Sequence, residues 1–220
     1  MSSEIWKKVD EYIESLVVPE DANLQQTRKY SNRNSLPEIN VSPAQGKLLQ
    51  LLVKMSGSKR ILEIGTLGGY STIWIAGAAN DIQITTIEAN EHHAKTAQNN
   101  FNRAKLTDRI HLICSDGKTA IERMIRSGSQ PFDFIFLDAD KFNNPIYLDL
   151  CLQLSHPGTI IICDNVVRKG ELINEQSADP DVQGMREYCE KIGSNSSLHS
   201  TVIQTVGRKG YDGFTISVVE

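Results

Sequence analysis

The stretch RILEIGTLGGYSTIWIAGAA, residues 60–79, begins as an apolar strand, turns through a run of glycines and continues as a helix. Residues 60–65 have the composition of a buried strand, and residues 71–79 have the pattern of the helix after it. Glycines let the backbone bend sharply and approach a ligand, and the helix N-terminus offers unpaired N–H groups. This unit predicts an α/β sheet that carries a ligand site where the strand ends.

Four more apolar runs follow, and each comes after a helical or turn segment. Strands that alternate with helices predict a mostly parallel sheet covered by helices on both faces. The expected strands cover residues 83–89, 109–116, 132–140 and 158–166, and a helix is expected over residues 91–104. The C-terminal end differs, because residues 198–206 and 211–220 read as a β-hairpin around a glycine turn. The last strand is therefore expected to run antiparallel to the others.

The N-terminal quarter is predicted to be helical. Apolar residues keep helical spacing from Ile5 to Val17, and the pattern covers about the first 30 residues. Ser42 and Pro43 then begin a second helix, and Gly57 ends it. The expected apolar face of this helix is Leu48, Leu49, Leu51, Leu52 and Met55. No repeat or linker separates a second domain, so a single domain is predicted over residues 1–220, with a helical extension (1–56) and an α/β core (57–220).

Composition limits the partners and the compartment. The chain has 220 residues, of which 23% are charged, and its net charge is −4. A nucleic-acid-binding protein would more usually show a basic stripe, so a nucleic-acid partner is disfavoured. Four scattered cysteines without a C-x-x-C pair predict reduced thiols in a cytoplasmic protein. No apolar run suits a signal peptide, an anchor or a membrane span.

Polar residues at the first two strand ends indicate a nucleoside-containing cofactor. Glu63 stands before the glycine turn, which includes Gly65 and ends near Ser71. Glu88 ends the second strand, about 20 residues farther on, where an acid typically accepts hydrogen bonds from ribose hydroxyls. The dinucleotide fingerprint G-x-G-x-x-G is absent, and Glu63 would repel a pyrophosphate but suits an ammonium group. S-adenosylmethionine therefore fits the turn better than NAD does.

The stretch FIFLDADK, residues 134–141, ends a buried strand in charged residues. Asp138 at this exit and the pair Asp164–Asn165 at the next are oxygen donors that suit Mg²⁺ or a similar divalent ion. Three protein oxygens leave about three octahedral positions, which a water and a vicinal diol or catechol would fill. A bound cation would lower the pKa of the nearby Lys141, which suits this amine to act as general base. For Asp138 or Lys141 alone, a solvated surface cluster would be the ordinary interpretation.

With these segments in order, the sequence resembles the cation-dependent, S-adenosylmethionine-dependent O-methyltransferases. That family includes catechol O-methyltransferase and the caffeoyl-CoA O-methyltransferases, whose bacterial members are the most similar. The resemblance covers residues 40–214 and rests on NVSPAQGKLLQLL, RILEIGTLGGYSTIW, TTIEAN, FIFLDADK, DNVVRKG and TVGRKGYDGF. It implies a Rossmann-like methyltransferase fold with seven strands, the last of them reversed, and commonly a homodimer.

The resemblance also implies roles for individual residues. It implies cofactor contacts at Val41, Glu63, Gly65, Ser71, Glu88, Asp116 and Asp138, metal ligands at Asp138, Asp164 and Asn165, and a catalytic lysine at Lys141. Within the cofactor set, Glu63 and Ser71 would hold the methionine end, Glu88 the ribose, and Asp116 would lie near the adenine. One position departs from the family pattern, because Asn144 replaces a tyrosine that many relatives carry. This replacement bears on substrate contacts more than on metal or cofactor binding.

Three functions remain open at this point. The first is methyl transfer to one hydroxyl of a small catechol-like phenol, such as a phenylpropanoid or flavonoid. The second keeps this chemistry but acts on a hydroxylated uridine in tRNA, as some relatives do, and the net negative charge argues against it. The third is a module that binds S-adenosylmethionine without catalysis, and the intact set of Asp138, Lys141, Asp164 and Asn165 argues against that.

Overall fold

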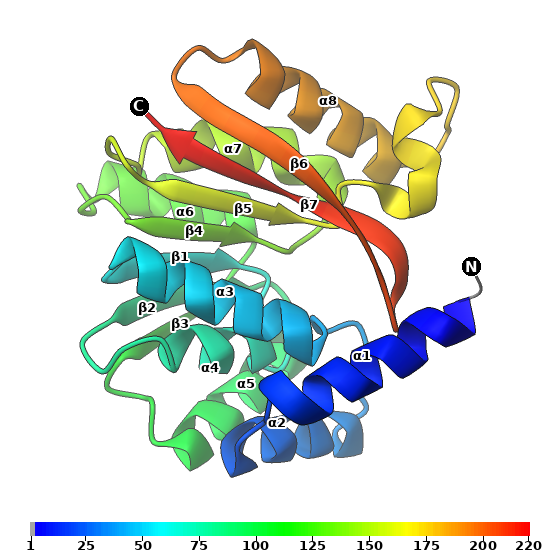
Figure 1. Cartoon of the computed structure of the whole chain (residues 1–220). Helices are drawn as coiled ribbons and strands as arrows, with labels where there is room; N and C mark the ends of the chain where they lie inside the picture. The colour runs from blue at the N-terminus through cyan, green and yellow to red at the C-terminus, as the bar shows by residue number, and fades with distance from the viewer. Residues whose placement is uncertain (1–2) are drawn as a thin grey trace.

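The computed structural model describes residues 3–220, and residues 1 and 2, at the start of the predicted extension, lie outside them. One seven-stranded sheet has the order β3-β2-β1-β4-β5-β7-β6 (Figure 1). The strands are β1 (Arg60–Ile64), β2 (Gln83–Glu88), β3 (Ile110–Cys114), β4 (Phe134–Leu137), β5 (Ile160–Asp164), β6 (Leu198–Gly207) and β7 (Gly210–Val219). The first five are parallel, and β7 runs antiparallel to both β5 and β6. The predicted sheet with a reversed last strand is confirmed.

Helices cover both faces of the sheet, as predicted (Figure 1). One layer holds α3 (Pro43–Ser56), α4 (Tyr70–Ala76) and α5 (Glu91–Ala104), and the other holds α6 (Gly117–Arg126), α7 (Asn144–Leu152) and α8 (Pro180–Ser194). Neighbouring strand residues point to opposite layers, so Ile61 packs in the cluster of Trp74 and Phe101. The next residue, Leu62, packs in the cluster of Leu148 on the other face. Two short 3₁₀ turns, η1 (Lys141–Asn143) and η2 (Arg168–Ile173), follow β4 and β5.

The predicted N-terminal helical region is divided into two helices, α1 (Ser3–Val17) and α2 (Ala22–Arg33). Pro19 explains the break, because proline has no N–H and disfavours helical geometry in the residue before it. Asp21 begins α2 by accepting a hydrogen bond from the Leu24 N–H at 2.9 Å. No side chain of α1 is buried, so this helix depends on contacts along one side, with α3 and β6.

Helix α3 begins and ends where predicted, but its apolar face was partly wrong. Ser42 caps it by accepting from the Gln45 N–H, and Gly57 ends it with φ 70°. Leu51 and Met55 are 42% and 73% exposed instead of buried. The buried face is Gly46, Leu49 and Val53, with Pro43 at its start. Glycine on this face lets α3 approach the Trp74 ring of α4 closely, and this approach sets which side of α3 turns inward.

Across residues 3–220, no helix combines the length and the apolar character that crossing a membrane requires.

We predict that Gly46→Ala destabilises the protein by about 1–3 kcal/mol, although alanine is the better helix former. A Cβ at position 46 would overlap the Trp74 ring, which is 2% exposed. The matched control is Gly193→Ala in α8, where a Cβ would meet no atom within 4 Å. That change should stabilise the fold by roughly 0.5–1 kcal/mol. Urea unfolding of both variants tests this, and an unchanged or higher stability of Gly46→Ala would contradict the contact.

Candidate active site

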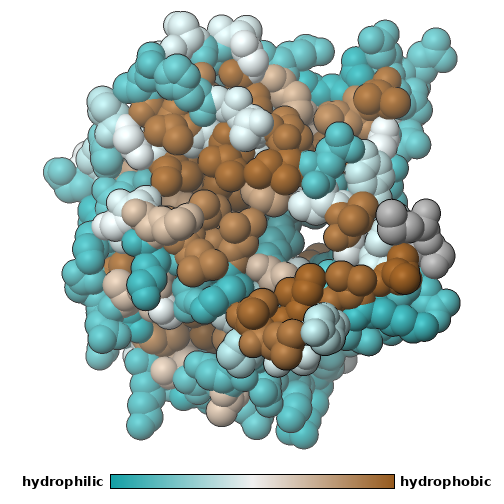
Figure 2. Space-filling model, in the orientation of Figure 1, coloured by the Kyte–Doolittle hydropathy of each residue, from teal (hydrophilic) through white to brown (hydrophobic). Residues whose placement is uncertain are grey.

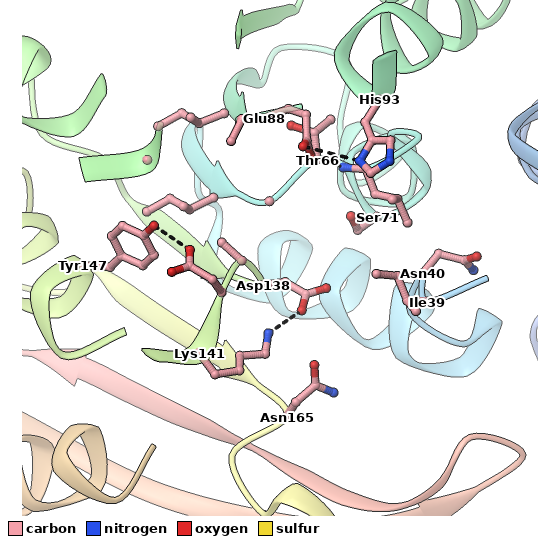
Figure 3. A pocket seen from close by; sticks show the side chains of 18 of the residues that line it. Ile39, Asn40, Thr66, Ser71, Glu88, His93, Asp138, Lys141, Tyr147 and Asn165 are labelled. Carbon is pink, nitrogen blue, oxygen red and sulfur yellow. Dashed lines mark hydrogen bonds and ion pairs between the residues drawn. The ribbon is translucent and has the colours of Figure 1, made fainter. Parts of the chain in front are cut away.

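A cavity of about 530 Å³ lies at the carboxyl ends of the parallel strands (Figure 3). The chain runs outward from β1 to β3 and then returns to β4, so β1 and β4 flank the point where the strand order reverses. Loops separate at such a point and leave a crevice. The walls come from the loops after β1 to β4, from residues 39–41 and from parts of η2 and α8.

The glycine turn after β1 passes directly against the exit of β4. Gly65 has φ 98°, and a Cβ at this position would overlap the backbone carbonyl of Asp138. Only glycine therefore allows the two loops to approach this closely. Leu67 also has a positive φ, of 49°, and its N–H donates to Glu88 Oε2 at 2.7 Å. The turn is thus held on one side by β4 and on the other by the acid at the end of β2.

Glu88 lines the cavity and is nearly buried, with 9% of its surface exposed. Its Oε1 accepts from the Asn90 N–H at 2.9 Å, and its Oε2 accepts from Leu67. His93 Nδ1 lies 3.5 Å from Glu88 Oε1 and also faces the cavity (Figure 3). Sequence patterns did not select His93 as a site residue. No local pattern could have selected it, because its position depends on how α5 packs beside the end of β2.

Glu63 lies behind the cavity wall and does not line it. The residue is fully buried, and its carboxylate accepts hydrogen bonds from Ser71 and Thr86, both at 2.6 Å, and from Thr72. Burial raises the Glu63 pKa to about 7, although the three hydroxyls oppose the shift. In this arrangement Glu63 orients Ser71, the hydroxyl that does face the cavity.

The other residues predicted to contact a cofactor share the cavity wall: Val41, Gly65, Ser71, Glu88, Asp116 and Asp138. Asp116 also caps α6, accepting from the Thr119 N–H at 2.9 Å, so it has a structural role as well. Val41 is 3% exposed and stands on the segment that enters α3. The structure thus gathers on one surface residues that are up to 97 positions apart, as Val41 and Asp138 are.

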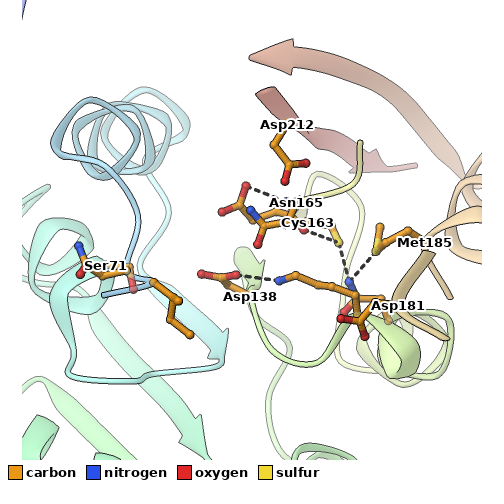
Figure 4. Close-up of polar contacts among 12 residues, drawn as sticks. Ser71, Asp138, Cys163, Asn165, Asp181, Met185 and Asp212 are labelled. Carbon is orange, nitrogen blue, oxygen red and sulfur yellow. Dashed lines mark hydrogen bonds and ion pairs between the residues drawn. The ribbon is translucent and has the colours of Figure 1, made fainter. Parts of the chain in front are cut away.

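Lys141 is almost buried, with 5% of its surface exposed, and its Nζ donates to Asp138 Oδ1 at 2.8 Å (Figures 3 and 4). Burial lowers the pKa of this amine, but the carboxylates of Asp138 and Asp164 outweigh burial, and the Lys141 pKa is raised. Without a further positive charge, Lys141 therefore keeps its proton.

Asp164 ends β5 and is 6% exposed. Burial, followed by the charge of Asp138, raises the Asp164 pKa to about 7. Its Oδ1 accepts from the Asn165 N–H at 2.8 Å, and Asn165 adopts φ 57°, which turns the chain sharply after β5. No group of three His, Cys, Asp or Glu residues suited to a metal occurs within residues 3–220. The predicted donor set instead combines two carboxylates with the side-chain amide of Asn165.

Comparison with known proteins identifies the family. The sequence model of the O-methyltransferase family matches residues 14–217. This chain belongs to the O-methyltransferase family. It is 40% identical to a catechol O-methyltransferase of Niastella koreensis, over 100% of both chains. It is also 40% identical to a catechol O-methyltransferase of Mycobacterium tuberculosis, over 96% of this chain and 94% of the relative.

Solved structures of similar proteins have the same fold. An O-methyltransferase from Bacillus cereus in complex with SAH has a TM-score of 0.98 and 46% identity, and each chain is covered fully. The O-methyltransferase TomG from Streptomyces achromogenes, in complex with SAM, has a TM-score of 0.95 and 40% identity, over 100% of this chain and 99% of TomG. The Rossmann-like methyltransferase fold implied by the resemblance is therefore confirmed for this O-methyltransferase.

Sequence patterns missed an ion pair on the cavity wall. Arg168 Nη2 lies 3.3 Å from Asp181 Oδ2, and both residues line the cavity. Asp181 Oδ1 in turn accepts from the Phe142 N–H at 3.2 Å, which ties α8 to the turn that carries Lys141. Both residues belong to a polar segment of the sequence, residues 168–181. Arg168 begins the η2 turn, and Asp181 is in the first turn of α8.

Asn144, the departure from the family pattern, does not reach the cavity of this O-methyltransferase. Its side chain is fully buried, and its amide nitrogen lies 3.1 Å from both Cys163 Sγ and Met185 Sδ (Figure 4). An effect of this replacement on substrate contacts stays a prediction, and such an effect would be indirect. Asn144 acts instead in the packing of α7 between β5 and α8.

We predict that Glu63→Gln removes a pH-dependent penalty on folding. The Glu63 pKa is about 7 in the folded protein and near 4.5 in the unfolded chain, so wild-type stability falls as pH rises between these values. The stability of Glu63→Gln relative to wild type should therefore increase across this interval, by on the order of 3 kcal/mol. Urea unfolding of both proteins from acidic to neutral pH measures the difference. A difference that stays constant with pH would contradict the raised pKa.

Proposed function

We propose that this O-methyltransferase, acting as one domain over residues 1–220, transfers the methyl group of S-adenosylmethionine to one hydroxyl of a catechol-like small molecule. We further propose that a divalent cation such as Mg²⁺ holds the acceptor. The observation that carries this proposal is the set of Asp138, Asp164, Asn165 and Lys141 at the ends of β4 and β5, beside the large cavity. The relatives named catechol O-methyltransferase and the neighbours solved with SAH and SAM support it.

The cavity residues suit the parts of S-adenosylmethionine. Ser71 and Val41 would contact the methionine end, and Glu63 would hold the Ser71 hydroxyl from behind. Glu88 would accept from the ribose hydroxyls. Both of its oxygens already accept backbone N–H groups, but a carboxylate has about four acceptor positions, so two remain. Asp116 would lie toward the adenine.

The residues at the ends of β4 and β5 fit a divalent cation. Asp138 pairs with Lys141, whereas Asp164 has no cationic partner of its own within residues 3–220 that lies at ion-pair distance. A buried carboxylate without such a partner is costly to ionise, as its raised pKa shows. Carboxylate and amide oxygens are the ligands that Mg²⁺ and related ions prefer. When bound, the ion would act as a Lewis acid toward the acceptor oxygens.

Proton removal is the proposed task of Lys141. The amine must be neutral to accept a proton, and the two aspartates now hold it in the charged form. Neutralising those aspartates would remove this effect and lower the Lys141 pKa. Lys141 then takes the proton of one acceptor hydroxyl, the resulting oxyanion attacks the methyl carbon, and the carbon–sulfur bond breaks.

We predict that purified protein with S-adenosylmethionine and Mg²⁺ methylates catechols, and that EDTA abolishes the transfer. Lys141→Ala should lower kcat about 100-fold to 10,000-fold, the usual contribution of a positioned general base. The matched control is Lys95→Ala, because Lys95 lies exposed on α5 and does not line the cavity. Mass spectrometry of the products measures the transfer.

Two results would count against the proposal in different ways. Transfer that persists in EDTA would rule out the proposed metal requirement but would leave the proposed substrate class unaffected. If no catechol is methylated while S-adenosylmethionine still binds, the proposed substrate class is ruled out. The next acceptor to test would then be tRNA.

We also propose that the enzyme is a homodimer that pairs through α1. This helix exposes Ile5, Val9, Tyr12, Ile13, Leu16 and Val17. Figure 2 shows a row of hydrophobic residues along it. Val202 and Ile203 of the adjacent edge strand β6 are exposed as well. Contiguous apolar surface of this kind usually marks an interaction site.

Light scattering coupled to size exclusion should find a dimer for wild type and a monomer for the double variant Tyr12→Glu, Leu16→Glu. Charges at the centre of an apolar interface cannot be buried without partners. Ile173→Glu is the control, since Ile173 is 86% exposed and lies in η2, outside the row. A wild-type monomer, or a dimer that survives the double change, would rule out this interface.

A further inference from the structure

A second cavity, of about 300 Å³, adjoins the proposed metal residues. Asp164 and Asn165 line it, and Ile39 lines both cavities. Its other walls are the first turns of α3 and the tip of the β6–β7 hairpin. Figure 2 shows the molecule hollowed beside α1, and the apolar side chains of that helix form one border of the hollow. A group bound at the ends of β4 and β5 would therefore extend into this space.

One part of the second cavity is apolar. Leu48 comes from α3, while Val206 and Phe214 come from the hairpin strands. Phe214 is 5% exposed and belongs to the core, so this wall is rigid. Such a surface suits the face of an aromatic ring.

Three acids line this cavity, Asp164 beside the proposed metal site and Asp10 and Asp212 on the other walls. Asp10 Oδ2 accepts from the Arg208 N–H at 2.6 Å, and Asp212 Oδ1 accepts from three backbone N–H groups at 2.9 to 3.1 Å. Arg208 is engaged too, because its Nη1 lies 2.7 Å from Glu14 Oε2. The contacts of Asp10 and Arg208 hold the hairpin tip against α1, and the ion pair with Glu14 offsets the charge of Arg208.

Lys209 differs from its neighbours. Its Nζ donates to the Ile39 carbonyl at 2.9 Å and to the Asn40 carbonyl, and no carboxylate within residues 3–220 lies at ion-pair distance. Backbone carbonyls accept hydrogen bonds from the ammonium but do not neutralise its charge. The residue as a whole is exposed, yet desolvation of its ammonium lowers the Lys209 pKa, while Asp138 and Asp164 oppose the shift. The ammonium is thus a partly desolvated positive charge on the wall of the second cavity.

We propose that the second cavity holds the body of the methyl acceptor and that Lys209 selects acceptors whose ring carries a carboxylate. This inference rests on the proposed function, since it presumes a diol held at Asp138, Asp164 and Asn165. A carboxylate would pair with the one cation of the cavity that has no acidic partner among the described residues. The Lys209 ammonium would repel a protonated amine at the same place.

The test compares three acceptors of the same ring and different charge: protocatechuate, unsubstituted catechol and dopamine. For wild type, kcat/KM should be highest for protocatechuate and lowest for dopamine. Lys209→Met keeps an unbranched side chain that is one atom shorter and removes the charge. It should lower kcat/KM for protocatechuate about tenfold to a hundredfold and change that for catechol by less than about threefold. Lys209→Arg should retain the order of the three acceptors.

Lys169→Met is the matched control, because Lys169 follows the proposed metal residues but lines neither cavity. It should leave the preference unchanged. Equal losses for protocatechuate and catechol in Lys209→Met would show that Lys209 only holds residues 39 and 40, and would overturn the inference. So would a wild-type enzyme that methylates the three acceptors equally well. No methylation of any of them would instead refute the proposed function, and this inference with it.

Discussion

The approach of Gly65 to the Asp138 carbonyl is the contact on which the site depends. A Cβ at residue 65 would overlap that carbonyl, so the turn after β1 and the loop after β4 can meet only because the residue is glycine. The turn carries the cavity residues that would hold a cofactor, and the β4 loop carries Asp138 and Lys141. The loops after the adjacent parallel strands β1 and β4 are thereby fixed against each other. The residues proposed to hold the cofactor therefore adjoin those proposed to act on the acceptor.

Buried charged groups near this contact lower the stability of the folded protein. Glu63 and Asp164 are buried acids whose pKa values are raised to about 7, and Lys141 is a buried amine held charged by its neighbours. An apolar replacement of similar size would fold more easily. Groups of this kind are retained where a ligand uses them, and perturbed titratable groups that converge on a cavity are typical of active sites. The same residues therefore weaken the isolated chain and suit the proposed chemistry.

The second cavity is bordered by segments from both ends of the chain, α1 and the β6–β7 hairpin. The hairpin tip contacts α1 through Arg208 and reaches residues 39 and 40 through Lys209, across 170 positions of sequence in the case of Ile39. These contacts are polar, and α1 buries none of its own side chains. The central sheet, by contrast, is held by two apolar layers. The apolar layers thus position Asp138 and Asp164, while the part proposed to enclose an acceptor is attached by ion pairs and hydrogen bonds.

The sequence by itself determined the order and type of the strands, the reversed last strand and the identity of the acids at the strand ends. These features follow from local composition, since apolar runs, glycine turns and polar exits are properties of short segments. It did not determine which acid faces the cavity. Glu63 and Glu88 both stand near strand ends, yet only Glu88 lines the cavity, because Glu63 pairs with Thr86, two residues before Glu88, and the hydroxyls of Ser71, Thr72 and Thr86 enclose it. The positions of His93, Arg168 and Lys209 were likewise decided only by tertiary structure, because each depends on how a helix or hairpin packs against a distant segment.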